Sequence, residues 1–139
     1  ASADGREPES ALVGAVLTSL QGDTVEDLIP WATGATPATL ATLAPVVMSI
    51  AATGDQRASS LVALAVEELV LHVRTLARQL FGDERASVPV AFGGGLLAKG
   101  SLLRKRLEHR LKVAVPGAQP RGEEVIPVRG AVRAAIRAL

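Results

Sequence analysis

The chain has 139 residues, of which 48% are hydrophobic, and this is enough for one domain with a core of its own. Only 2% are aromatic, so the core must consist mainly of Leu, Val and Ala, and the abundance of Ala and Leu favours helices. The sequence contains no cysteine, which excludes a disulfide scaffold, a thiol nucleophile, a thiolate zinc site and a cysteine-ligated iron–sulfur cluster within this chain.

Charge is distributed unevenly along the chain. Residues 1–70 contain two basic and nine acidic side chains, a net charge of −7, whereas residues 71–139 contain thirteen basic and five acidic ones, a net charge of +8. The second half therefore has a positive field that suits a phosphate-bearing ligand. Charges at helical spacing also fit ordinary solvated helix faces, so the pattern alone leaves both interpretations open.

Neither a leader nor a membrane span is predicted. The polar segment 1–7 lacks the apolar run of a signal peptide and does not begin with Met, so we expect a cytoplasmic protein and a piece of a longer product. The segment 28–54 is uncharged and long enough to cross a bilayer. Because it contains three prolines, a glycine and several threonines, we expect a loop followed by a buried helix and no membrane partner.

Apolar spacing predicts several short helices in the first half. One is expected over residues 12–20 and a second over 25–29, with Asp23 or Thr24 as its cap and Pro30 as its end. Trp31 then falls in a loop, either as a core anchor or at an interface.

A further helix is predicted to begin with Thr36 as its cap and Pro37 as its first residue. It should bend at Pro45, which lacks an amide proton, and end at Gly54. Its expected buried stripe consists of Leu40, Leu43, Val46, Val47 and Ile50.

The longest helix is predicted over residues 56–81, between an Asp55 cap and a Gly82 terminator. Its predicted buried side consists of Leu61, Leu64, Ala65, Leu69, Val73, Leu76 and Leu80.

The pattern changes after Gly82. We expect a buried strand over 88–92, a helix over 102–111 capped by Ser101, a second strand over 113–115, a loop over 119–126 and a last helix over 128–138. In the helix over 102–111 we expect three leucines to face inward: Leu103, Leu107 and Leu111. Four basic residues should face outward: Arg104, Lys105, Arg106 and Arg110.

The alternation of strands and helices predicts parallel strands and an α/β class with a helical front. The expected organisation is a helical part over about 8–82 and a strand–helix part over about 88–139.

Three glycines, Gly93, Gly94 and Gly95, directly follow the first predicted strand. Without a Cβ, a backbone can approach a nucleotide closely, and the carboxyl end of a strand is where ligands bind in open α/β sheets. The spacing is neither that of a P-loop nor GxGxxG. Such a turn serves either nucleotide contact or tight packing, and the residues alone do not decide.

Five segments in the same order resemble the family of N-acetylglucosamine kinases and BadF/BadG/BcrA/BcrD-type ATPases. Residues 4–8 resemble its DGRGP segment, with Glu7 where glycine is usual, and residues 25–31 resemble PEDLVRW. Residues 43–55 are similar to LAPLV…AGD, residues 93–107 to AGGLF…LLRERL, and residues 128–131 to PVxGA. The resemblance covers nearly the whole chain.

The resemblance implies a ribonuclease-H-like, actin-type ATPase lobe, the C-terminal lobe of an ATP-dependent amino-sugar kinase. It implies ATP with Mg²⁺, the metal being held mainly by the other lobe, and N-acetylglucosamine or glucosamine as substrate. It places Gly93, Gly94, Gly95 and Leu96 beside the adenosine and the helix beginning Pro127 near the same cleft. It also implies a homodimer or pairing with an N-terminal lobe.

Several motifs of that family are absent from this chain: its DGGxTKT phosphate loop, its catalytic aspartate segment and its GTGS-type turn. We therefore expect no catalytic residue here and no activity of the chain alone. The alternative is a non-catalytic binding or dimerisation module with the same fold. The related activator ATPases of radical dehydratases hold a cluster with cysteines, which this sequence lacks.

Other candidates are weaker on residue chemistry. His72 and His109 lack visible metal-binding partners, and the adjacent pairs at 67–68 and 123–124 are typical of solvated carboxylates. A basic cluster over 104–112 has no interleaved aromatic residues for base stacking, so no nucleic-acid partner is expected.

Overall fold

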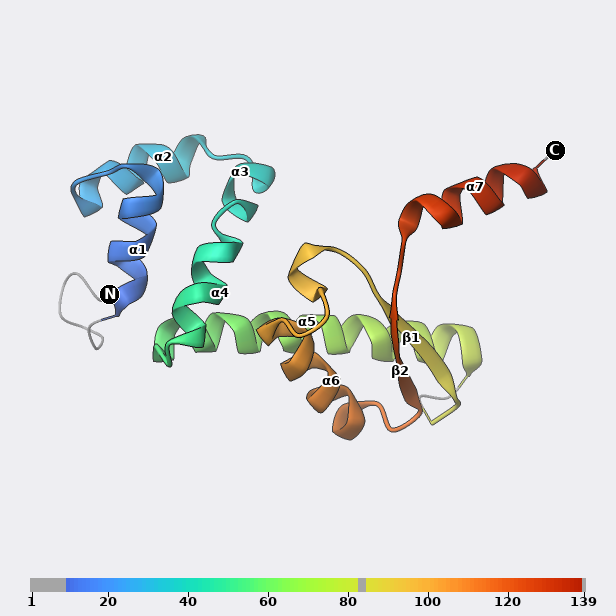
Figure 1. Cartoon of the computed structure of the whole chain (residues 1–139). Helices are drawn as coiled ribbons and strands as arrows, with labels where there is room; N and C mark the ends of the chain where they lie inside the picture. Colours follow the sequence, from blue (N-terminus) through green and yellow to red (C-terminus); the bar gives the residue numbers. More distant parts are fainter. Residues whose placement is uncertain (1–9, 83–84, 139) are drawn as a thin grey trace. The chain divides into compact units, whose positions relative to one another are not determined.

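The computed structural model describes residues 10–82 and 85–138 as a mixed α/β chain, mostly helical with one two-stranded parallel sheet (Figure 1). Its elements are α1 (Ala11–Leu20), η1 (Val25–Asp27), α2 (Leu28–Gly34), α3 (Pro37–Ala41), α4 (Ala44–Ala52), α5 (Gln56–Phe81), β1 (Val88–Phe92), η2 (Gly95–Leu97), α6 (Leu102–Ala114), β2 (Ala118–Glu124) and α7 (Pro127–Arg137). The chain forms two compact units, Ala1–Ala65 and Val66–Leu139, whose boundary lies within α5.

In the first unit, α1 packs against α4, and a polar contact fixes the start of α1. The Asp55 carboxylate accepts hydrogen bonds from the Ser10 hydroxyl at 3.0 Å and from the Ala11 amide at 3.0 Å. It also accepts from the Ala58 amide at 2.9 Å, so Asp55 caps α5 as predicted. The hydrogen bond from Ala58 is the main reason why the pKa of Asp55 is lowered.

The prediction that Pro30 ends a helix was wrong. Pro30 is the third residue of α2, a position whose amide would have no intrahelical acceptor, so proline fits there and the helix continues to Gly34. Trp31 therefore lies in a helix rather than in a loop. Thr24 caps the preceding 3-10 turn, because the Asp27 carboxylate accepts from its amide at 2.8 Å and its hydroxyl at 3.0 Å.

Thr36 caps α3 as predicted, accepting from the Thr39 amide at 3.2 Å. The expected bend at Pro45 is instead a complete break, because α3 ends at Ala41 and Pro45 lies in the first turn of a new helix, α4. The predicted buried stripe is only half-buried, and Leu40 is 46% exposed.

The predicted buried face of α5 was also wrong. Ala58, Val62, Val66 and Val70 are buried at intervals of four residues, and Ala77 is buried seven residues further on. Of the predicted side chains, Leu69 and Val73 are half-buried, whereas the other leucines are exposed, at 65% for Leu64 and 71% for Leu80. Both faces of this helix are apolar, and the structure buries the one with smaller side chains.

The second unit is built on the sheet and α6. β1 has the predicted bounds and is buried at its two ends, at Val88 and Phe92. Leu103, Leu107 and Leu111 of α6 are buried as predicted.

The second strand lies elsewhere than predicted: residues 113–114 belong to α6, and β2 occupies 118–124, where a loop was expected. β2 contains Pro120 and Gly122, which disfavour strands, so its pairing with β1 decides its conformation. Proline is tolerated at the edge of a sheet, where its missing amide needs no partner.

The strands are parallel, as predicted, with Val88 opposite Ala118 and Phe92 opposite Glu124. The offset between partners rises from 30 to 32 residues along the pair, so β2 accommodates two residues more than β1. The irregularity lies between Val90 and Phe92.

Gly117 is required where the two strands begin. Its carbonyl accepts from the Val88 amide at 2.9 Å. A Cβ at this position would overlap the backbone carbonyl of Ala86, so only glycine allows the two segments to approach this closely.

Beyond β2, the last helix α7 has the predicted start at Pro127, and all of its residues are exposed. Within the described ranges, no helix is both long enough and apolar enough to cross a membrane.

Candidate functional site

The carboxyl ends of β1 and β2 lie at the same edge of the sheet because the strands are parallel. β1 ends at Phe92 and runs into the three glycines, and β2 runs into the segment leading to α7. A Cβ built on Gly93 would lie 3.7 Å from the Cβ of Val125, so these two segments are in contact. Ligands of open α/β sheets bind at such an edge.

The glycine turn, residues 93–97, has an unusual backbone. Gly94 adopts φ 94° and ψ 154°, a conformation that essentially only glycine takes. The Gly94 carbonyl accepts a hydrogen bond from the Leu97 amide at 3.0 Å, and η2 follows from Gly95 to Leu97. The predicted nucleotide contacts, Gly93 to Leu96, are all exposed, and a Cβ on Gly94 or Gly95 would meet no atom within 4 Å. The surface above the turn is therefore open to a ligand.

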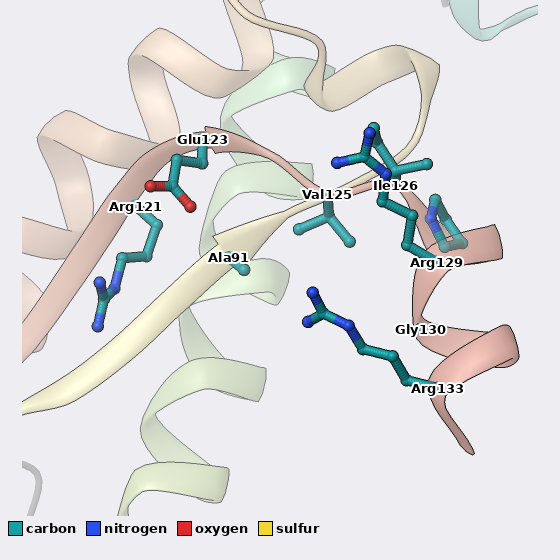
Figure 2. Close-up of a pocket in the computed structure, with 9 residues that line it drawn as sticks. Ala91, Arg121, Glu123, Val125, Ile126, Arg129, Gly130 and Arg133 are labelled. Atoms are coloured by element: carbon teal, nitrogen blue, oxygen red, sulfur yellow. The ribbon is translucent and has the colours of Figure 1, made fainter. Parts of the chain in front are cut away.

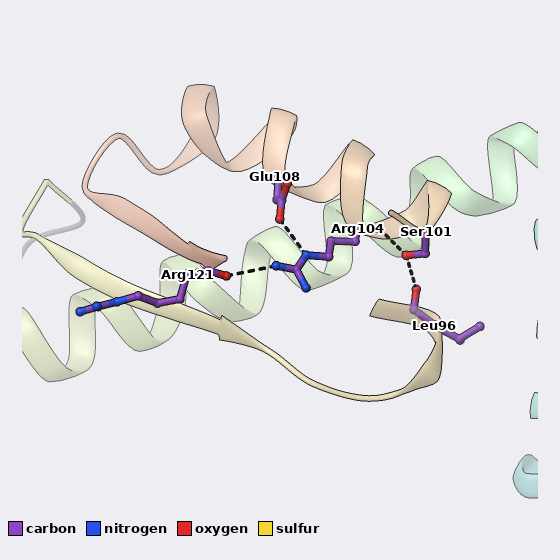
Figure 3. Close-up of polar contacts among 5 residues, drawn as sticks. All are labelled: Leu96, Ser101, Arg104, Glu108 and Arg121. Carbon is purple, nitrogen blue, oxygen red and sulfur yellow. Dashed lines mark hydrogen bonds and ion pairs between the residues drawn. The ribbon is translucent and has the colours of Figure 1, made fainter. Parts of the chain in front are cut away.

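Ser101 ties the glycine turn to the start of α6 (Figure 3). Its hydroxyl donates to the Leu96 carbonyl at 2.8 Å and accepts from the Arg104 amide at 3.2 Å. One side chain thus caps the helix, as predicted, and fixes the position of the turn.

A pocket of about 460 Å³ lies at the same edge of the sheet, and we call it the arginine pocket (Figure 2). Its lining includes Ala91, Arg121, Glu123, Val125, Arg129 and Arg133. In Figure 2, Arg133 reaches from α7 back toward Ala91 and Val125, and Arg121 lies beside Glu123 on the other side. Three arginines and one glutamate give the lining a net formal charge of +2.

Arg104 was predicted to be exposed on α6, and this was wrong, because only 4% of it is accessible. Its Nε donates to Glu108 at 2.8 Å and its terminal nitrogen donates to the Arg121 carbonyl at 3.1 Å (Figure 3). The guanidinium also lies 4.8 Å from the centre of the Phe92 ring. Arg104 therefore joins α6 to both strands.

Arg110 of α6 also makes an ion pair, with Glu67. It binds both carboxylate oxygens of Glu67, at 2.6 and 3.1 Å. The hydrogen bond from Arg110 lowers the pKa of Glu67. Of the basic cluster considered for nucleic acid, these two members are engaged within the protein.

The remaining candidates gain no support as sites. His72 and His109 are exposed, and within residues 10–82 and 85–138 no group of three or more His, Asp or Glu side chains is placed to hold a metal ion. The cationic residues at the sheet edge thus fit an anionic ligand.

Trp31, left open between core and interface, is half-buried and lines a second pocket of about 300 Å³ in the first unit. Gln21, Asp23 and Asp27 line it as well. The Asp27 carboxylate is already engaged by three donors from residues 23 and 24.

The arginine pocket was not predicted from the sequence, and Arg121, Arg129 and Arg133 were not among the predicted site residues. The available signal was the spacing of arginines at 129, 133 and 137, with no acidic residue from 127 to 139.

The chain matches no protein-family model, no curated protein and no solved structure with which it was compared.

Proposed function

We propose that this chain is the nucleotide-binding C-terminal lobe of an ATP-dependent amino-sugar kinase, acting on N-acetylglucosamine or glucosamine, and that it is inactive alone. The observation that supports the proposal best is the exposed glycine turn at the carboxyl edge of two parallel strands. The adenosine would lie against the open surface of Gly94 and Gly95.

The division of labour follows from the residue types at this edge. Phosphoryl transfer needs a positioned nucleotide, Mg²⁺ and an acid or base at the accepting hydroxyl. The described residues offer an open backbone surface and cationic side chains, which can position a nucleotide. The metal ligands and the base would come from the N-terminal lobe, with which this lobe would close over ATP and sugar.

Gly95→Val is the sharpest test of the glycine turn. A Cβ at Gly95 meets no protein atom within 4 Å and this residue lacks a positive φ, so the variant should fold. The added side chain would occupy the space of the ligand, and we expect ATP affinity to fall by roughly tenfold or more, equivalent to about 1.4 kcal/mol. Isothermal titration of the 139-residue chain with ATP measures this.

The choice of position matters. Gly94→Val would force a valine into a conformation reserved for glycine, so it tests folding as much as binding. Gly14→Val, on an open face of α1, is a control for adding the same side chain elsewhere. ATP affinity that is unchanged in Gly95→Val contradicts the proposal.

In the complete enzyme the same substitution should raise the KM for ATP and leave the KM for the amino sugar unchanged. An equal rise in both KM values would mean that the turn affects closure of the two lobes in general, and it would contradict a role beside the nucleotide.

A second candidate function is supported by exposed apolar side chains. Leu76 and Leu80 lie one turn apart on α5, in the second unit, and are 54% and 71% exposed. A non-catalytic module that dimerises through such a face would sediment as a dimer and show no ATP affinity, whereas the kinase lobe binds ATP.

A further inference from the structure

Arg129 and Arg133 of α7 lie at positions that helix stability does not favour for arginine. Arg129 and Arg133 lie four residues apart, so they share one face of the helix, where like charges are destabilising. Arg129 also lies in the first turn, where the helix dipole disfavours a cation, and no acidic residue offsets it there. Helix stability therefore does not account for this pair.

The three guanidinium groups at the pocket also lack carboxylate partners. Among the described residues, neither an ion pair nor a side-chain hydrogen bond engages Arg121, Arg129 or Arg133. Glu123 lines the same pocket but makes no ion pair with them.

We propose that the arginine pocket binds a small, phosphate-bearing anion, with Arg129 and Arg133 holding the phosphate oxygens and Arg121 on the opposite side. Planar guanidinium groups bind phosphate through paired hydrogen bonds, and a volume of about 460 Å³ is that of a small-molecule site. The inference goes beyond the proposed function, because it requires neither the glycine turn nor a sugar.

A pocket ligand fits these residues better than a macromolecule does. The lining contains no aromatic side chain on which a nucleic-acid base could stack. Figure 2 shows the Arg133 side chain reaching from α7 toward Val125 and Ala91, so its charge points into the pocket. Inorganic pyrophosphate is a compact anion, and its phosphate oxygens suit guanidinium donors.

Isothermal titration of the 139-residue chain with inorganic pyrophosphate tests the proposal. We expect Arg133→Gln and Arg129→Gln each to weaken binding about tenfold, since each removes charged hydrogen bonds to the ligand. Arg137→Gln is the matched control, because it removes the same charge from the same helix but outside the pocket lining. Its affinity should stay close to that of the parent.

Two further measurements keep the result interpretable. Circular dichroism should give unchanged melting curves for the glutamine variants, because these side chains are exposed. Arg129→Lys retains the charge but not the planar fork, and it should bind with intermediate affinity.

Absence of pyrophosphate binding, or an equal loss in Arg137→Gln, overturns the proposal. So does binding that appears only with anionic phospholipid vesicles or single-stranded RNA, which would mean a headgroup or nucleic-acid surface. Gly95→Val separates this proposal from the kinase lobe: it should weaken ATP but leave pyrophosphate affinity unchanged.

Discussion

Helices α6 and α7 both carry arginines at helical spacing, yet the structure uses them in opposite ways. Arg104 of α6 is 4% exposed and makes three contacts, with Glu108, the Arg121 carbonyl and the Phe92 ring. Arg133 of α7 is exposed and meets no carboxylate among the described residues. The two helices show that an arginine cluster in a sequence can be a structural brace or a free cationic surface.

The largest expected effect is on stability at Arg104. Arg104→Ala removes the bridge between α6 and both strands and leaves the Arg121 carbonyl without its donor, so we expect the free energy of unfolding to fall by about 3 kcal/mol. Arg133→Ala, as the matched control, should change it by less than about 0.5 kcal/mol. Urea unfolding measures both, and similar losses would break the distinction between the helices.

A somewhat smaller loss of stability is expected for a substitution in the sheet that Arg104 joins to α6. In Gly117→Ala the new Cβ must displace the backbone of Ala86, which we expect to cost about 2 kcal/mol of unfolding free energy. Gly122→Ala adds the same carbon to β2 in open space and should be nearly neutral. A neutral Gly117→Ala would mean that the strands do not need this close approach.

The smallest effect concerns the exposed pair of Glu67 with Arg110. The pKa of Glu67 is lowered from its usual 4.5, so the pair stabilises the fold above that pH and loses its contribution as pH falls through the lowered value. Glu67→Gln should therefore be slightly less stable than the parent at about pH 7, and the difference should vanish once the pH lies below the lowered pKa of Glu67. High salt should also remove the difference, because the pair is exposed.

Glu68→Gln is the control for this measurement, as its carboxylate makes no ion pair with any residue that the structure describes. A stability difference for Glu67→Gln that persists at low pH would show that the pair is not its source.

The features that were predictable from the sequence depend on neighbours along the chain. Thr36, Asp55 and Ser101 cap their helices through amides two or three residues away, so local residue types decide them. β1 was likewise recognisable from a short β-rich run, and the glycine turn from its place after that strand.

The features that were missed depend on contacts between distant residues. β2 contains proline and glycine and becomes a strand through β1, about thirty residues earlier in the chain. The buried face of α5 is ambiguous because leucines and valines occupy different sides of it. Arg104 has Glu108 four residues later, whereas Arg133 has Arg137, but the burial of Arg104 also depends on its position over the distant Phe92 ring.

The two extra residues that β2 accommodates set a rule for changes in chain length. Side chains alternate between the two faces of a strand, so an excess of two keeps Arg121 and Glu123 on the sides they now occupy. Deleting one residue at 121–122 would move Glu123 to the other face of β2, whereas deleting both would restore the parity. Natural or engineered variants of this fold should therefore tolerate length differences here in pairs.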